Sequence, residues 1–287
     1  MHRASILAAV VLAGFQRADL QAASAPVPFK VSSSIAELRI VPTTRLPKNR
    51  KAERLDEYCS NYAILRPKTP GGRLAKQGGW IVTSETKLGN YDAVTFVRAL
   101  EAATSGTCAH EDGNLGIFEG PRVRAVVFEP APSAAADPND LGALDSLGSA
   151  EQINAKRIRL NWGLPSPPFA DVIFRDGVSV EPIAKEDPVC KGAGAVPNVF
   201  GQDIRKARKR LIAYGWRPSR SKDSLHGGIE GELRAQGVVE TESCSGTGYG
   251  FCGFDYRHPG GMSLSVLSTG DDYSVISYAV QCGRRQR

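Results

Sequence analysis

Six cysteines constrain the fold of this chain more than any other feature of its sequence. None of them has the C-x-x-C or Cys/His spacing that a structural metal site requires, and their number is even, which favours disulfides. Six cysteines allow 15 pairings. Cys59 and Cys108 are the only two in the first half of the chain, so they form one expected pair. The other two expected pairs lie in the second half and are Cys244 with Cys252 and Cys190 with Cys282.

The two pairs in the second half follow from the segments between them. Cys244 and Cys252 flank the glycine-rich stretch CSGTGYGFC, which predicts a hairpin loop closed by a disulfide. Cys190 and Cys282 bracket the C-terminal part of the chain and would close a loop of about 90 residues. A disulfide across such a loop is worth about 4 kcal/mol in the chain-entropy model. The cysteines therefore predict a protein that folds in an oxidising compartment.

The amino terminus predicts export independently. His2 and Arg3 precede an apolar run of about a dozen residues at 4–15, which is too short to span a bilayer as a helix and suits a secretory signal. Residues 1–25 are the predicted signal peptide, with cleavage after Ala23 or Ala25. The alternative interpretation is a buried N-terminal helix. No other segment is long and apolar enough to be transmembrane, so we expect a periplasmic or secreted protein.

Charge and composition restrict the partners. Lys and Arg outnumber Asp and Glu by 36 to 30, which allows attraction to anionic partners without requiring it. Five basic residues gather in one predicted helix, where the alternative interpretation is an ordinary solvated helix face. Nucleic acid is the least expected partner, because export separates the protein from it and few aromatic residues lie among the charges. The basic residues of the helix are Arg205, Lys206, Arg208, Lys209 and Arg210.

The pattern along the chain predicts an α+β fold. A β-rich domain is expected over 26–185, with a flexible Ala- and Pro-rich insertion at 130–147, and a small helix-on-antiparallel-sheet domain over 195–287. The boundary is placed at 186–194. The expected strands are 36–41, 80–83, 91–100, 114–118, 123–128, 157–162, 171–174, 178–182, 238–243, 252–256, 262–267 and 274–280, and the expected helices are 48–57, 202–214 and 228–236.

The segment VPNVFGQDIRKARKRLIAYGW, residues 196–216, resembles the opening of a PASTA domain. Val196-Pro197 supplies an extended lead, Ala207 and Leu211 share one helix face, and Gly215 follows the helix. The resemblance covers about 20 residues and implies a helix-on-sheet start and, if it extended further, recognition of muropeptides. After Trp216 the Gln-x-Pro hairpin of that family is missing. The rest of this C-terminal pattern resembles domains of secreted bacterial proteins to which no activity is attached.

No catalytic constellation stands out. Ser84 to Lys87 and Ser219 to Lys222 have the S-x-x-K spacing of some serine nucleophiles, but no S-D-N or K-T-G follows them in the required order. His110 is expected at the surface in a polar turn, rather than as a zinc ligand. The glycines at 246–250 are interpreted as a hairpin loop, not a phosphate cradle, because no helix follows them.

We therefore expect a binding protein without catalytic activity, metal or cofactor, for anionic envelope components such as peptidoglycan or lipopolysaccharide. The first alternative is a protein-interaction or inhibitor module that presents Tyr249 and Phe251 to an exported partner. The second is a hydrolase whose site is assembled only by folding.

Overall fold

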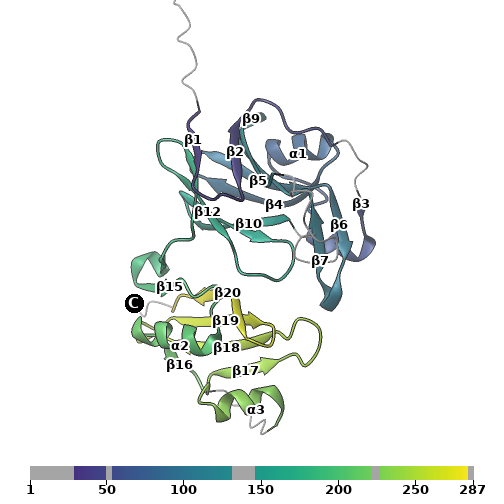
Figure 1. Cartoon of the computed structure of the whole chain (residues 1–287). Helices are drawn as coiled ribbons and strands as arrows, with labels where there is room; N and C mark the ends of the chain where they lie inside the picture. Colours follow the sequence, from purple (N-terminus) through teal and green to yellow (C-terminus); the bar gives the residue numbers. More distant parts are fainter. Residues whose placement is uncertain (1–28, 50–53, 131–145, 221–226, 284–287) are drawn as a thin grey trace, which may run out of the picture.

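The computed structural model describes residues 29–49, 54–130, 146–220 and 227–283. Within these residues the chain forms many strands and few helices, arranged in two parts with separate cores (Figure 1). Buried apolar residues from Leu38 to Val180 form the cores of the first part, and those from Val196 to Val275 form the core of the second. This is the β-rich α+β fold that the sequence predicts.

Two five-stranded sheets face each other in the first part. Leu115 and Ile117 of one sheet meet Ile158 and Val172 of the other, so the alternate residues of each strand build a shared core. The expected hairpins at 115–128 and 171–182 are both present. In order across the sheets, the strands are β1 (Val31–Ser33), β13 (Val178–Glu181), β12 (Ala170–Phe174), β11 (Arg157–Trp162) and β10 (Leu147–Asn154), and β2 (Arg39–Pro42), β9 (Arg122–Phe128), β8 (Asn114–Glu119), β5 (Tyr91–Val97) and β4 (Ile81–Leu88).

Helix α1 (Pro70–Gln77) packs on the outer face of the second sheet and was not expected from the sequence. Its start has a clear local cause, because the Thr69 side chain accepts a hydrogen bond from the Gly72 nitrogen and Pro70 occupies the first helical position. A Cβ at Gly71 would lie 2.5 Å from Cγ of Phe118. The absence of a side chain at Gly71 therefore lets the helix approach the sheet. The same glycines lower the helix propensity of the segment, so the helix is hard to predict from the sequence.

A small sheet of β3 (Arg54–Leu55), β6 (Ala99–Ala102) and β7 (Cys108–Glu111) corrects two predictions. The sequence predicts a short helix at 48–57, but the residues of this segment that the structure describes do not form one. Arg54 and Leu55 pair with β6, and a 3-10 helix, η1 (Glu57–Tyr62), follows. The expected strand 91–100 divides at Arg98, whose guanidinium binds Glu111 and Asp112, so β5 and β6 belong to different sheets.

The second part is an antiparallel sheet covered by helices, as predicted. Ile204, Ala207 and Leu211 of α2 (Ile204–Ala213) are fully buried against this sheet. Gly215 follows with a φ of +87°, which a residue with a side chain seldom adopts. The strands are β16 (Arg217–Pro218), β17 (Thr241–Cys244), β18 (Cys252–Arg257), β19 (Ser263–Thr269) and β20 (Ser274–Gln281), and the second helix is α3 (Gly228–Ala235).

The segment expected to mark the boundary is itself ordered. β14 (Glu186–Val189) and β15 (Gly194–Pro197) form a hairpin through η4 (Cys190–Gly192). The predicted insertion lies mostly at 131–145, outside the described residues, but its expected end is wrong because Leu147 is buried and begins β10. The predicted signal peptide also lies outside them. No helix among the described residues is long and apolar enough to cross a membrane.

Candidate binding surface

All three expected disulfides are present. Cys59 is bonded to Cys108, Cys190 to Cys282, and Cys244 to Cys252. The first ties η1 to β7, and the third joins two residues that are opposite each other in the pairing of β17 with β18. The third bond therefore closes the base of the β17–β18 loop, whereas the first holds η1 against the β7 side of the β6–β7 hairpin.

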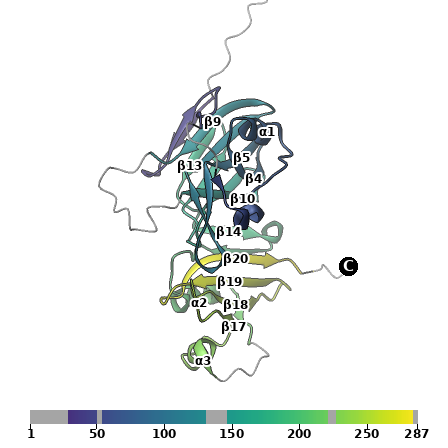
Figure 2. The same cartoon turned by 90° about the vertical axis from the view of Figure 1, so that its right-hand side faces the viewer.

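Two loops, one from each part of the chain, meet at their tips. Ser105 lies in η2 (Thr104–Gly106), between β6 and β7, and its Oγ accepts a hydrogen bond of 3.1 Å from the Tyr249 backbone nitrogen. Gly248 approaches the same side chain so closely that a Cβ there would lie 1.6 Å from Ser105 Oγ. Figure 1 shows the β6–β7 hairpin pointing down toward the loop between β17 and β18, and Figure 2 shows the first part of the chain above the C-terminal sheet. No feature of the sequence indicated this contact.

Aromatic side chains surround the contact. Tyr58 and Tyr62 of η1 are 59% and 40% exposed, and the Tyr62 hydroxyl donates a 3.0 Å hydrogen bond to the Gly106 carbonyl. Tyr249 and Phe251 are half-buried, with ring centroids 5.9 Å apart. We call these four side chains, with the loop tips at 104–107 and 245–251, the stapled surface. It contains the two aromatic residues that the sequence singled out and adds two from the other part of the chain.

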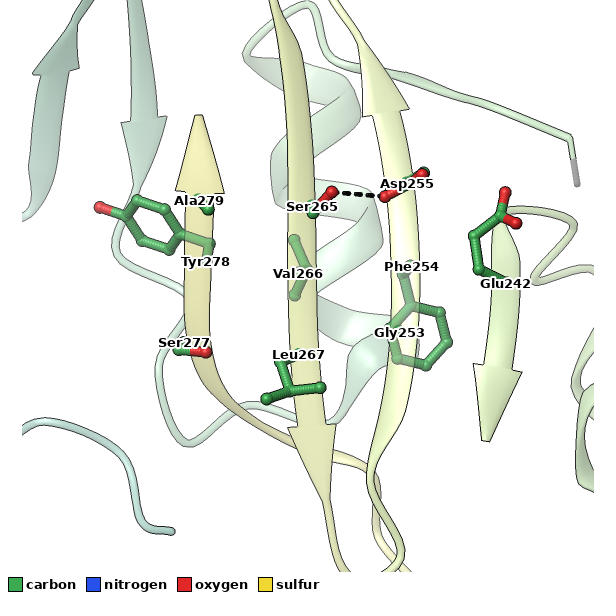
Figure 3. A pocket seen from close by; sticks show the side chains of 10 residues that line it. All are labelled: Glu242, Gly253, Phe254, Asp255, Ser265, Val266, Leu267, Ser277, Tyr278 and Ala279. Carbon is green, nitrogen blue, oxygen red and sulfur yellow. Dashed lines mark hydrogen bonds between the residues drawn. The ribbon is translucent and has the colours of Figure 1, made fainter. Parts of the chain in front are cut away.

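A shallow trough of about 510 Å³ lies on the open face of the C-terminal sheet, opposite α2 (Figure 3). Its lining mixes polar and apolar residues, and Ser265 donates a 2.6 Å hydrogen bond to Asp255 within it. β18, which lines part of the trough, begins at Cys252, directly after Phe251 of the stapled surface.

The predicted basic patch on α2 carries less unpaired positive charge than the sequence suggests. Arg205 binds Asp203, with Nε 2.9 Å from Oδ1, and Arg208 Nε lies 2.9 Å from the fully buried carboxylate of Glu240. Lys206, Lys209 and Arg210 are exposed and form no ion pair among the described residues. Two of the five predicted cations are thus paired, Arg205 with the N-cap residue of its own helix and Arg208 with Glu240, which folding brings to the helix.

The first S-x-x-K motif does not form a serine–lysine pair, and the described residues contain no metal-type cluster. The hydroxyl of Ser84 lies 2.6 Å from that of Thr95, and the amine of Lys87 is bound to Asp92, so the S-x-x-K spacing does not place the lysine on the serine. Lys222 of the second such motif lies outside the described residues. No group of three or more His, Cys, Asp or Glu in this part of the chain is arranged to hold a metal ion.

His110 corrects a further prediction. It is not a surface residue but a buried member of β7, 4% exposed, with Nδ1 2.9 Å from the Cys108 carbonyl oxygen. Burial lowers the pKa of His110 to about 4, although the contact with this carbonyl opposes the shift. The ring is therefore neutral at pH 7 and belongs to the core next to the Cys59–Cys108 disulfide.

A buried charge cluster joins the two parts of the chain. Arg159 of β11 is 2% exposed and contacts Asp171 of β12 at 2.9 Å and Asp187 of β14 at 2.6 Å. Arg157 binds Asp187 as well, and the hydroxyl of Tyr278 in β20 donates to the same carboxylate. The cluster thus links the first sheet, the boundary hairpin and the C-terminal sheet.

Further contacts complete this junction. The Arg159 guanidinium lies 5.1 Å from the centroid of the Phe200 ring, which stacks on Tyr278. Sequence reasoning identified β11 but missed the cluster. Its only signal was the alternation of Arg157 and Arg159 with apolar residues, opposite Asp171 in the next predicted strand. Asp187 and Tyr278 had no local signal, because their role depends on docking.

No protein-family model, curated protein or solved structure matches the chain. The features that bear on function are therefore those of the chain itself: a joined two-part scaffold, the stapled surface, the trough on the C-terminal sheet, and three exposed cations on α2.

Proposed function

We propose that this chain is an exported, non-catalytic binding protein that recognises another protein through its stapled surface. One observation carries the proposal: four partly exposed aromatic rings, from two parts of the chain, lie on η1 and on the 245–251 loop, which contacts the 104–107 loop, with the 245–251 loop closed by one disulfide and η1 tied to β7 by another. The apolar amino terminus and the three disulfides support export.

The physical chemistry of aromatic residues supports a protein partner. Tyr and Phe offer a large contact area with few rotatable bonds, so ordering them in a complex costs little entropy, and such residues dominate the energetics of protein interfaces. The Cys244–Cys252 disulfide restricts the 245–251 loop before binding, and Cys59–Cys108 restrains η1 against β7, which reduces that cost further. The hydrogen bond from Tyr249 to Ser105 orients the two loops toward one another.

The test is a comparison of three immobilised proteins against the exported fraction of the source cells. A partner identified on the wild type should be lost from the variant Y58A/Y62A/Y249A/F251A. It should be retained by the control variant I212A/Y214A, which removes two exposed apolar side chains of α2, 42% and 38% exposed. Binding measured with the purified partner should weaken by at least tenfold in the first variant alone. Equal binding by all three would reject the stapled surface.

A second candidate function is the binding of anionic envelope polymers by α2. The observation that favours it is the exposure of Lys206, Lys209 and Arg210 without an ion pair among the described residues. Retention on purified peptidoglycan and lipopolysaccharide at low salt should disappear in the variant K206E/K209E/R210E. Retention that survives this change would remove the helix from consideration.

A further inference from the structure

The chain segments that form and border the stapled surface have an unusual charge. These segments are 56–62, 104–107, 245–251 and 269–273, and the last is included because Gly270 N donates a 2.8 Å hydrogen bond to the Tyr249 carbonyl. Together they contain four carboxylates and no lysine or arginine, in a chain whose net charge is +6. The carboxylates are Asp56, Glu57, Asp271 and Asp272.

Most of this negative charge is not neutralised locally. Glu57, Asp271 and Asp272 are exposed and form no ion pair among the described residues, whereas Asp56 accepts a hydrogen bond from the Tyr58 nitrogen at the start of η1.

Two guanidinium groups border the surface, and both are already paired. Arg54 Nη2 lies 2.5 Å from Glu101 and 3.0 Å from Glu111. Arg205 lies over the Tyr273 ring and binds Asp203.

We infer that the partner of the stapled surface is a basic polypeptide segment, an inference that rests on the proposed function. Its Lys or Arg side chains would pair with Glu57, Asp271 and Asp272, while its apolar side chains cover the rings of Tyr249 and Phe251. Charge complementarity selects this class of partner, because like charges facing each other across an interface cost several kcal/mol. Arginine is especially suited, since its planar head pairs with carboxylates and stacks on aromatic rings. Anionic polymers would be repelled from this surface.

The test selects ligands from a phage-displayed library of random 12-residue peptides on the purified full chain and measures the selected peptides by calorimetry. Two variants with equal change in charge are compared. E57K/D271K/D272K reverses the surface, and E37K/D176K/E232K reverses three exposed acids elsewhere. The uncharged variant E57Q/D271N/D272N repeats the first change without adding cations, in case the lysines disturb the fold.

We expect peptides enriched in Lys and Arg. Their affinity should fall at least tenfold in E57K/D271K/D272K and severalfold in the uncharged variant, and it should stay within twofold in the control. It should also fall steeply between 0.05 and 0.5 M salt, because exposed charge pairs are screened.

Three outcomes would overturn the inference. Neutral or acidic peptides that bind the charge-reversed variant normally, but fail to bind Y58A/Y62A/Y249A/F251A, would reject a basic partner and leave the proposed function intact. Peptides that bind regardless of the aromatic residues would reject both. Self-association that disappears on charge reversal would assign the surface to a second copy of this chain instead.

Discussion

His110 illustrates how burial decides the chemistry of a single residue in this chain. Its neighbours in the sequence, Glu111 and Asp112, suggest an exposed polar turn. Asp112 does turn the chain, with a φ of +53°, but the strand before it directs the imidazole inward. Polar neighbours in the sequence do not show whether a side chain is buried. The pKa of His110 depends on its burial, which only the folded structure shows.

The buried imidazole predicts a loss of stability in mild acid. The pKa of His110 is about 4 in the folded chain and about 6.5 when unfolded, so the unfolded state binds more protons between these values. The stabilisation is complete above pH 6.5 and is lost as the pH falls toward 4, by about 3 kcal/mol in total. Urea unfolding of H110Q from pH 7 to 4 should show a shallower decline than the wild type. Parallel declines would contradict the assignment.

The disulfides Cys244–Cys252 and Cys190–Cys282 differ in how much of the chain they restrain. Cys244 and Cys252 are eight residues apart and are opposite each other in the pairing of β17 with β18, and β18 also pairs with β19. Cys190 and Cys282 are 92 residues apart and enclose the whole C-terminal sheet. Loop length therefore distinguishes a bond that shapes a local surface from one that holds a domain.

This difference predicts unequal effects of removing the bonds. The double variant C190S/C282S should lose about 4–5 kcal/mol of unfolding free energy, because the unfolded loop regains most freedom. The variant C244S/C252S should lose about 2–3 kcal/mol and keep the sheet. Chemical denaturation followed by far-UV circular dichroism measures both losses. A greater loss from the shorter loop would show that native contacts, rather than chain entropy, determine the effect.

The elements were predicted where their patterns are local. Helix α2, helix α3 and the hairpin of β12 and β13 follow the expected positions because apolar spacing and turn residues specify them. Helix α1 was missed because its glycines lower helix propensity, although Thr69-Pro70 marked its start. β14 and β15 were expected to be a boundary, since a Pro- and Gly-rich stretch does not reveal that it pairs with itself.

At the scale of the whole molecule, the junction cluster determines whether the stapled surface exists as one unit. Tyr58 and Tyr62 belong to the first part of the chain, and Tyr249 and Phe251 to the second. The Ser105 to Tyr249 hydrogen bond is a small contact, whereas the cluster around Asp187 buries two arginines and two aspartates. We therefore expect the cluster to provide most of the polar energy that keeps the halves together.

The variant D187N tests this expectation. Removing the carboxylate leaves Arg157 and Arg159 partly unpaired in a buried site, which costs about 3–5 kcal/mol. We expect urea unfolding to divide into two transitions, with Trp216 reporting the second part and Trp80 the first. The exposed substitution D176N is the control and should leave a wild-type curve. A D187N curve within 1 kcal/mol of the wild type would contradict the role of the cluster.

The Asp187 carboxylate also makes the stability of the protein depend on pH, in a more acidic range than His110 does. Burial raises the pKa of Asp187, but hydrogen bonds from Arg159 and Tyr278 outweigh it and hold the pKa below its usual value. Its stabilisation is therefore present above about pH 4 and is lost as the pH falls through the lower, folded pKa. The wild type should lose more stability below pH 4 than D187N, which lacks the titrating group.

The sequence by itself determined the strand-rich class, the main helices of the C-terminal part and the three cysteine pairs, because each depends on local spacing or on a small number of partners. Tertiary structure decided which charges are neutralised and which aromatic residues lie together. Glu240 pairs with Arg208 of α2 from 32 positions away, and Ser105 joins Tyr249 from 144 positions away. The first pair forms when the C-terminal part folds and the second when the two parts of the chain meet, so no local pattern encodes either.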